Sequence, residues 1–107
     1  MEKYLPKVND KLYIRQKTGN FWVDSVKRPY TVIEVNGNTA TIQACKLIFN
    51  GPVYYDTYPD KIEADPNGKI MKLRWSDKKQ RWQESPTRGS YPYIAVFGSW
   101  EFEPYLN

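Results

Sequence analysis

The clearest structural signal in the chain lies at residues 31–44, which read Thr31-Val32-Ile33-Glu34-Val35-Asn36-Gly37-Asn38-Thr39-Ala40-Thr41-Ile42-Gln43-Ala44. Asn-Gly between two runs rich in β-branched residues is the strongest short-range signal for a β-hairpin. If Asn36 and Gly37 are the two turn residues, Ile33 lies opposite Ala40. One face of the hairpin then carries Ile33, Val35, Ala40 and Ile42, and the other carries Glu34, Thr39 and Thr41. The sequence therefore predicts an antiparallel hairpin with one apolar face.

A second hairpin is predicted near the end of the chain. Tyr93–Phe97 and Trp100–Glu103 flank Gly98-Ser99, and a glycine at the first turn position suits a type II′ turn. This pairing would place Phe97 opposite Trp100. Helical signals are scarce, because no window of ten residues keeps the helical apolar spacing and eight prolines interrupt the chain.

These elements predict an all-β protein. Residues 47–66 are rich in Gly, Pro, Asn and Asp, and we expect an irregular insertion there, with a short helical turn at Asp60–Ala64. Lys11–Gln16 alternates as a further strand. The segment Val8–Ile14, with Asp10 before alternating apolar positions, resembles the first strand of SH3-like barrels. We therefore expect one domain over residues 1–107, a small antiparallel, strongly curved sheet or SH3-like barrel.

The composition removes the usual catalytic chemistry. The chain has no histidine and one cysteine, so it offers no histidine general base and no structural zinc set. Cys45 is expected to be a small buried residue at the end of a strand. Glu101 and Glu103 would alternate on one face of a strand, which is ordinary patterning. We expect no enzyme activity, no metal and no cofactor.

No apolar run approaches membrane-spanning length, and the N-terminus lacks the apolar core of a signal peptide. We therefore expect no membrane segment and a cytoplasmic location. The lone cysteine agrees with a reducing compartment.

The charge of the chain is concentrated in one stretch. Residues 69–88 hold seven cations and two carboxylates, although the whole chain has a net charge of only +4. A hairpin with a loop at Ser76–Lys79 would place Leu73 opposite Trp82 and Arg74 opposite Arg81. Its outer face and tip then carry the residues expected to bind a partner, Lys72, Arg74, Lys78, Lys79 and Arg81. A local positive patch indicates an acidic protein, a nucleoprotein or nucleic acid as partner. The alternative is that these side chains extend into water and their stems cover the tryptophans.

A second candidate surface lies in the loop over residues 15–28. It combines cations with aromatic residues, of which Arg15, Lys17, Phe21 and Trp22 are the secondary site candidates. Exposed aromatics beside cations suit base stacking or a protein hot spot. The alternative is that Phe21 and Trp22 fold back over one end of the barrel.

Several blocks of the chain together resemble a family of small uncharacterised phage and prophage proteins of Gram-positive bacteria. The blocks are Tyr13–Gly19, Leu47–Pro52, Leu73–Ser76 and Arg81–Pro86. The resemblance implies a phage gene acting in the cytoplasm of a bacterial host cell, and it carries over no activity and no site residue. Small phage proteins without catalytic residues often act by stoichiometric binding.

Two functions follow as hypotheses. The first is an inhibitor that docks on a host defence nucleoprotein, as anti-CRISPR proteins do, through its basic, aromatic-flanked face. The second is an accessory module that binds nucleic acid directly with little sequence specificity. No recognition-helix pattern or aromatic RNA-binding signature favours sequence-specific readout.

Overall fold

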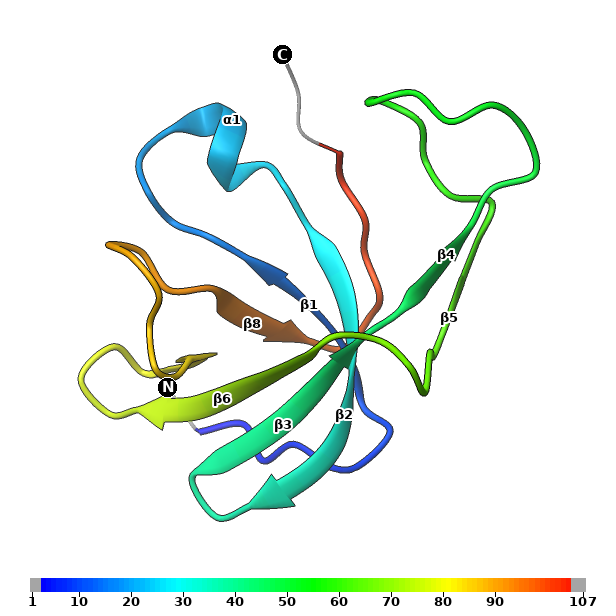
Figure 1. Ribbon diagram of the computed structural model, residues 1–107. Coiled ribbons are helices and arrows are strands. Elements are labelled where there is room, and N and C mark those ends of the chain that lie inside the picture. Colours follow the sequence, from blue (N-terminus) through cyan, green and yellow to red (C-terminus); the bar gives the residue numbers. More distant parts are fainter. Residues whose placement is uncertain (1–2, 105–107) are drawn as a thin grey trace.

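Six strands close into one antiparallel barrel in the computed structural model, which describes residues 3–104 (Figure 1). The order around the barrel is β1-β2-β3-β6-β7-β8, and β8 returns to pair with β1. The barrel strands are β1 Lys11–Arg15, β2 Arg28–Asn36, β3 Thr39–Ala44, β6 Ile70–Ser76, β7 Arg81–Glu84 and β8 Ile94–Phe97. The other described elements are the one-turn helix α1 Phe21–Asp24 and the short strands β4 Lys46–Ile48 and β5 Lys61–Glu63. The all-β prediction is confirmed, and the barrel is compatible with an SH3-like architecture.

The β2–β3 hairpin is present, but its predicted turn is wrong by one residue. Asn36 pairs with Thr39, so Gly37 and Asn38 form the turn. Gly37 has a φ of 61°, and a positive φ at the first turn position alone fits a type II′ turn. Glycine meets this requirement without steric cost, which explains why the turn centres on it.

A β-bulge changes which residues of β2 enter the core. The register shifts between Val32 and Glu34, so Ile33 is an extra residue on its strand. Val32 is fully buried opposite Ile42, whereas Ile33 is 38% exposed. The predictions that Ile33 faces the core and lies opposite Ala40 are therefore wrong. Val35 lies opposite Ala40 instead, and both are on the core side as predicted.

The predicted second hairpin is also wrong. β8 forms as expected, but its partner is β1, with Leu12 opposite Phe97 and Arg15 opposite Ile94. Gly98, at a φ of 123°, turns the chain away from the barrel wall. Pairing with β1 closes the barrel. A local hairpin after Gly98 would have used the same edge of β8 and left one edge of β1 unpaired.

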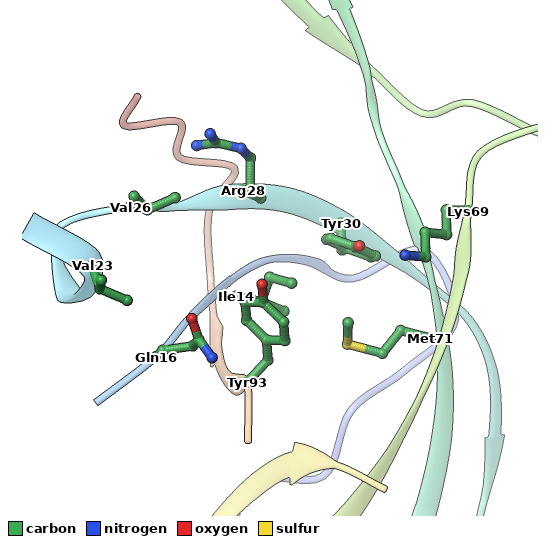
Figure 2. Close-up of a pocket in the computed structure, with 9 residues that line it drawn as sticks. All are labelled: Ile14, Gln16, Val23, Val26, Arg28, Tyr30, Lys69, Met71 and Tyr93. Carbon is green, nitrogen blue, oxygen red and sulfur yellow. The ribbon is translucent and has the colours of Figure 1, made fainter. Parts of the chain in front are cut away.

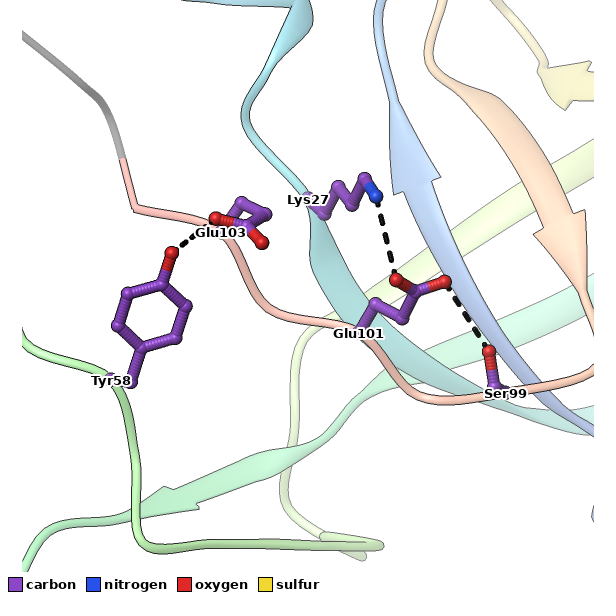
Figure 3. Close-up of polar contacts among 5 residues, drawn as sticks. All are labelled: Lys27, Tyr58, Ser99, Glu101 and Glu103. Atoms are coloured by element: carbon purple, nitrogen blue, oxygen red, sulfur yellow. Dashed lines mark hydrogen bonds and ion pairs between the residues drawn. The ribbon is translucent and has the colours of Figure 1, made fainter.

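The segment that follows Gly98 runs beside the start of β2 and is held by polar contacts (Figure 3). Glu101 pairs with Lys27 at 3.4 Å and accepts a hydrogen bond from Ser99. Glu103 accepts a hydrogen bond from the hydroxyl of Tyr58, and its backbone bridges to Lys27. The two carboxylates that the sequence placed on one strand face therefore engage different partners.

The insertion stands on a two-stranded base. β4 and β5 pair antiparallel, with Leu47 opposite Ile62, and project from the side of the barrel (Figure 1). The helical turn predicted at Asp60–Ala64 is wrong, because residues 61–63 are extended in β5. Cross-strand pairing satisfies the backbone groups that a lone helical turn would leave unpaired.

The core fills the barrel, and the N-terminal segment closes one end of it. The fully buried side chains include Leu12, Val32, Ile42 and Leu73. The ring of Tyr4 stacks on Phe97, with ring centroids 4.6 Å apart, and its backbone carbonyl accepts a hydrogen bond from the Trp82 indole at 2.9 Å. Across residues 3–104, no helix is long and apolar enough to cross a membrane.

Candidate functional site

The β6–β7 hairpin carries the basic stretch, in a register two residues away from the predicted one. Trp75 lies opposite Trp82, and Arg74 lies opposite Gln83. The expected pairs of Leu73 with Trp82 and of Arg74 with Arg81 are therefore wrong. The four loop residues are 77–80, and Trp75 caps this loop by donating its indole N–H to Asp77 at 2.8 Å. A shift of two residues keeps every side chain on its expected face.

Two neighbouring strands, β8 and β1, extend the outer face of this hairpin. Gln83 of β7 lies opposite both Arg74 of β6 and Ile94 of β8, and Ile94 lies opposite Arg15 of β1. Directly opposed residues share one face of a sheet. One row across the outer wall therefore runs from Arg74 to Arg15.

This wall joins the two regions that the sequence treated separately. A groove of about 940 Å³ is lined by residues that include Arg15, Lys17, Lys79 and Arg81. We call it the basic groove. Arg15 ends β1, Lys17 follows it, Arg81 begins β7 and Lys79 lies in the β6–β7 loop. Four cations from two separate segments thus face one concave surface.

The acidic residue that lines the basic groove, Asp24, is already engaged by the backbone. One of its oxygens accepts hydrogen bonds from the backbone N–H of Thr18 at 2.7 Å and from the Thr18 hydroxyl at 2.8 Å. The other accepts from the backbone N–H of Gly19 at 2.9 Å. These bonds, the backbone bond of Thr18 first, lower the pKa of Asp24 below its ordinary value. Asp24 fixes the loop that follows Arg15 and leaves the groove with a net positive charge.

The two arginines of the groove differ in their contacts. Arg81 donates from Nε to the side-chain oxygen of Gln83 at 2.9 Å, which orients its guanidinium along the wall. The Nε of Arg15 is buried and finds no acceptor within residues 3–104. A buried N–H without an acceptor costs free energy. An anion in the groove would offer acceptors to the same guanidinium group.

Three of the five primary candidates lie outside the groove lining. Lys72 donates to the hydroxyl of Thr41 at 2.8 Å, farther along β6. Arg74 lies on the same outer wall but lines a smaller neighbouring hollow, and Lys78 is exposed in the β6–β7 loop. The structure thus groups Lys79 and Arg81 with the secondary candidates Arg15 and Lys17.

Phe21 and Trp22 lie on α1 and do not fold back over the barrel. Their exposed fractions are 69% and 43%, and their rings meet edge to face with centroids 5.4 Å apart. Asn20 caps the helix by accepting from the backbone N–H of Trp22 at 2.9 Å. The exposed pair is therefore held on an ordered turn next to the Thr18–Asp24 hydrogen bonds.

Sequence reasoning missed another exposed region with aromatic residues. Val53, Tyr54 and Tyr55, at the far end of the β4–β5 ribbon, are 59%, 67% and 69% exposed. The ribbon and the β6–β7 hairpin project from opposite sides of the barrel (Figure 1). Two consecutive tyrosines in a turn-rich segment were the sequence signal that could have identified this region.

Two acidic residues of the insertion and the single cysteine have local contacts. In the insertion, Asp60 accepts from the backbone N–H of Asn50 at 2.7 Å, and Glu63 pairs with Lys61 at 2.8 Å. Cys45 is half-buried with its sulfur 3.4 Å from the Thr31 hydroxyl, and burial raises the pKa of its thiol. Comparisons with protein-family models, with curated proteins and with solved structures found no match to this chain.

Proposed function

We propose that the protein is a non-catalytic binding protein that docks by its basic groove on a nucleoprotein. The observation that carries the proposal is the convergence of Arg15, Lys17, Lys79 and Arg81 on one groove whose acidic residue, Asp24, is already bonded to its own loop. Convergent cations around a concave surface attract phosphate groups and acidic side chains. More specifically, we propose that the protein is a phage-type inhibitor of a host defence nucleoprotein, such as a CRISPR effector.

The exposed aromatic residues favour a nucleoprotein over a purely nucleic-acid partner. Tyr54 and Tyr55 belong to the loop between β4 and β5, and this ribbon projects from the opposite side of the barrel to the β6–β7 hairpin (Figure 1). They extend the apolar surface offered to a partner. Exposed tyrosines are common anchors in protein interfaces. A partner that carries both protein and nucleic acid can engage the two surfaces at once.

The test uses CRISPR effector ribonucleoproteins, assembled with guide RNA and assayed for target cleavage. We expect inhibition that saturates near one protein per effector and a complex that survives size-exclusion chromatography. The double variant Lys17→Gln/Lys79→Gln should lose inhibition, because both lysines are exposed in the groove. Its control, Lys7→Gln/Lys46→Gln, removes the same charge at exposed positions elsewhere and should inhibit normally. Full inhibition by the groove variant would contradict the assigned surface.

A second function is supported by the aromatic residue within the groove. Tyr91, 47% exposed, lines the basic groove beside the four cations, and bases stack on such rings. The protein would then bind single-stranded nucleic acid directly. Tight binding of a labelled oligonucleotide, together with a raised 260/280 nm absorbance ratio in protein purified without nuclease, would favour this function. Weak binding of naked nucleic acid with retained effector inhibition would favour the first.

A further inference from the structure

A second concave site lies at the end of the barrel next to α1. This barrel-end pocket has a volume of about 390 Å³. Its apolar wall includes Ile14 and Met71 from the barrel and Val23 and Val26 from the α1 segment (Figure 2). The ring of Tyr93 enters from the segment before β8. Since Lys79 and Arg81 do not line it, this site is separate from the basic groove.

The size of the barrel-end pocket fits a small ligand. An apolar protein cavity of about 150 Å³ holds a benzene molecule, and most ligand pockets fall between about 300 and 1,000 Å³. Mouths of β-barrels are a frequent place for such sites. At the opposite end of the barrel, the ring of Tyr4 stacks on Phe97.

Polar groups converge on one side of the pocket. Tyr30 is 7% exposed, and its hydroxyl makes no hydrogen bond within residues 3–104. Lys69 lies at the rim with its ammonium turned toward Tyr30 (Figure 2), and no carboxylate of the described residues pairs with it. A hydroxyl without a hydrogen-bond partner and an ammonium without a carboxylate partner among residues 3–104 therefore lie at the same edge of an apolar pocket.

Two further charged groups at or near the pocket, Arg28 and Glu84, are engaged by the backbone. Arg28 also lines it, but its guanidinium donates to the backbone carbonyls of Lys27 and Glu103. Glu84, the buried carboxylate of β7, accepts from the backbone N–H of Tyr93 at 3.4 Å and does not line the pocket. The lining thus carries two cationic side chains and no carboxylate, which favours an anionic ligand.

We propose that the barrel-end pocket binds a small carboxylic acid that carries one apolar ring. The ring packs between Met71, Ile14 and Tyr93. The carboxylate accepts hydrogen bonds from the Lys69 ammonium and from the Tyr30 hydroxyl. Each polar group of the pocket edge then gains the partner that the described chain does not supply.

The test uses 3-phenylpropionate as the probe and its neutral amide, 3-phenylpropionamide, as the matched control. Met71 is one of two methionines in the chain, so ¹³C-methyl labelling of methionine reports on the pocket, and a Met71→Leu variant assigns the signal. We expect a saturable shift of the Met71 methyl signal with the carboxylate. The amide should bind about fivefold to tenfold more weakly, because it loses the charged hydrogen bond.

Two variants separate the pocket from non-specific binding. Lys69→Gln should weaken the carboxylate about fivefold to tenfold and leave the amide unchanged, while Lys46→Gln, an exposed control on β4, should change neither. Val26→Trp fills the pocket from its half-buried rim and should abolish binding, whereas Val53→Trp in the exposed insertion should not. If Val26→Trp fails to fold, the Lys69→Gln comparison decides.

Three results would overturn the proposal. The first is no shift of the Met71 methyl up to about 10 mM probe, where a site with a Kd of about 1 mM would be nearly saturated. The second is equal affinity for the acid and the amide. The third is unchanged binding in a folded Val26→Trp variant or, where that variant does not fold, unchanged affinity of the carboxylate for Lys69→Gln.

Discussion

Trp75 lies directly opposite Trp82, and their rings meet edge to face with centroids 6.0 Å apart. Such pairs contribute about 0.5–1.5 kcal/mol beyond the area they bury. This pairing places Arg81 opposite Ser76 rather than opposite Arg74. The register with the paired tryptophans is therefore also the one in which Arg81 lines the basic groove with Arg15 and Lys17.

The first prediction concerns this aromatic pair. Trp82 is 2% exposed and donates to the carbonyl of Tyr4, whereas Trp75 is half-buried. Trp82→Ala should lower the free energy of unfolding by about 3–5 kcal/mol, the usual cost of truncating a buried tryptophan. Trp75→Ala should cost clearly less. Urea unfolding followed by far-UV circular dichroism measures both, and equal losses would contradict the assigned burial.

The bulge in β2 gives a second prediction, from two adjacent residues. Val32→Thr places a hydroxyl in the core and should cost about 1–3 kcal/mol, while Ile33→Thr at the 38% exposed position should change stability by about 0.5 kcal/mol or less. The measurement is the denaturation midpoint of each variant. A larger loss of stability for Ile33→Thr than for Val32→Thr would contradict the bulge and support a regular register with Ile33 in the core.

A third prediction isolates the backbone at the β2–β3 turn. A Cβ added at Gly37 or at Gly51 would meet no atom within 4 Å, but only Gly37 of the two has a positive φ, at 61°. Gly37→Ala should therefore destabilise by about 1–2 kcal/mol, the cost of the left-handed conformation. Gly51→Ala should be neutral or slightly stabilising. Equal changes in stability for the two substitutions would contradict the positive φ assigned to Gly37.

A fourth prediction concerns pH and the loop that follows Arg15. The pKa of Asp24 is lowered, chiefly by the backbone N–H of Thr18, so its ionised form is favoured in the folded state. Its stabilising contribution is present above the unfolded pKa of about 3.9 and is lost as the pH falls through the lower folded pKa. Carboxyl ¹³C chemical shifts should show Asp24 titrating below about 3.9. Thr18→Val removes the hydroxyl donor and should raise this midpoint, and an unshifted Asp24 would contradict the hydrogen bonds.

The fifth prediction measures phosphate contacts in the basic groove. If Lys17 and Lys79 each neutralise a phosphate of a single strand, the logarithm of the binding constant falls with the logarithm of salt concentration by about 0.7 per contact. The variant Lys17→Gln/Lys79→Gln should flatten that slope by about 1.4. Fluorescence anisotropy of a labelled single-stranded oligonucleotide provides the slope, with Lys7→Gln/Lys46→Gln as control. Identical slopes in both variants would argue against phosphate binding in the groove.

Local patterns predicted the elements of the fold better than their partners. The hairpin around Gly37 and the strand at Lys11–Arg15 follow from turn chemistry and alternation between near neighbours. The bulge at Ile33 does not, because one extra residue leaves no mark in a pattern of β-branched residues. The candidate site was also predicted only in part. Lys79 and Arg81 were assigned to one surface and Arg15 to another, and the sequence did not show that the three residues line the same groove.

The class of the fold, the positive charge of residues 69–88 and the lack of histidine chemistry all follow from the amino-acid sequence. These properties depend on composition and on contacts between residues close in the chain. The pairing of β8 with β1 became visible only in the folded barrel, because closing a barrel depends on which distant edges meet. That closure, through Arg15 opposite Ile94 and Ile94 opposite Gln83, brings two separate basic segments to one groove.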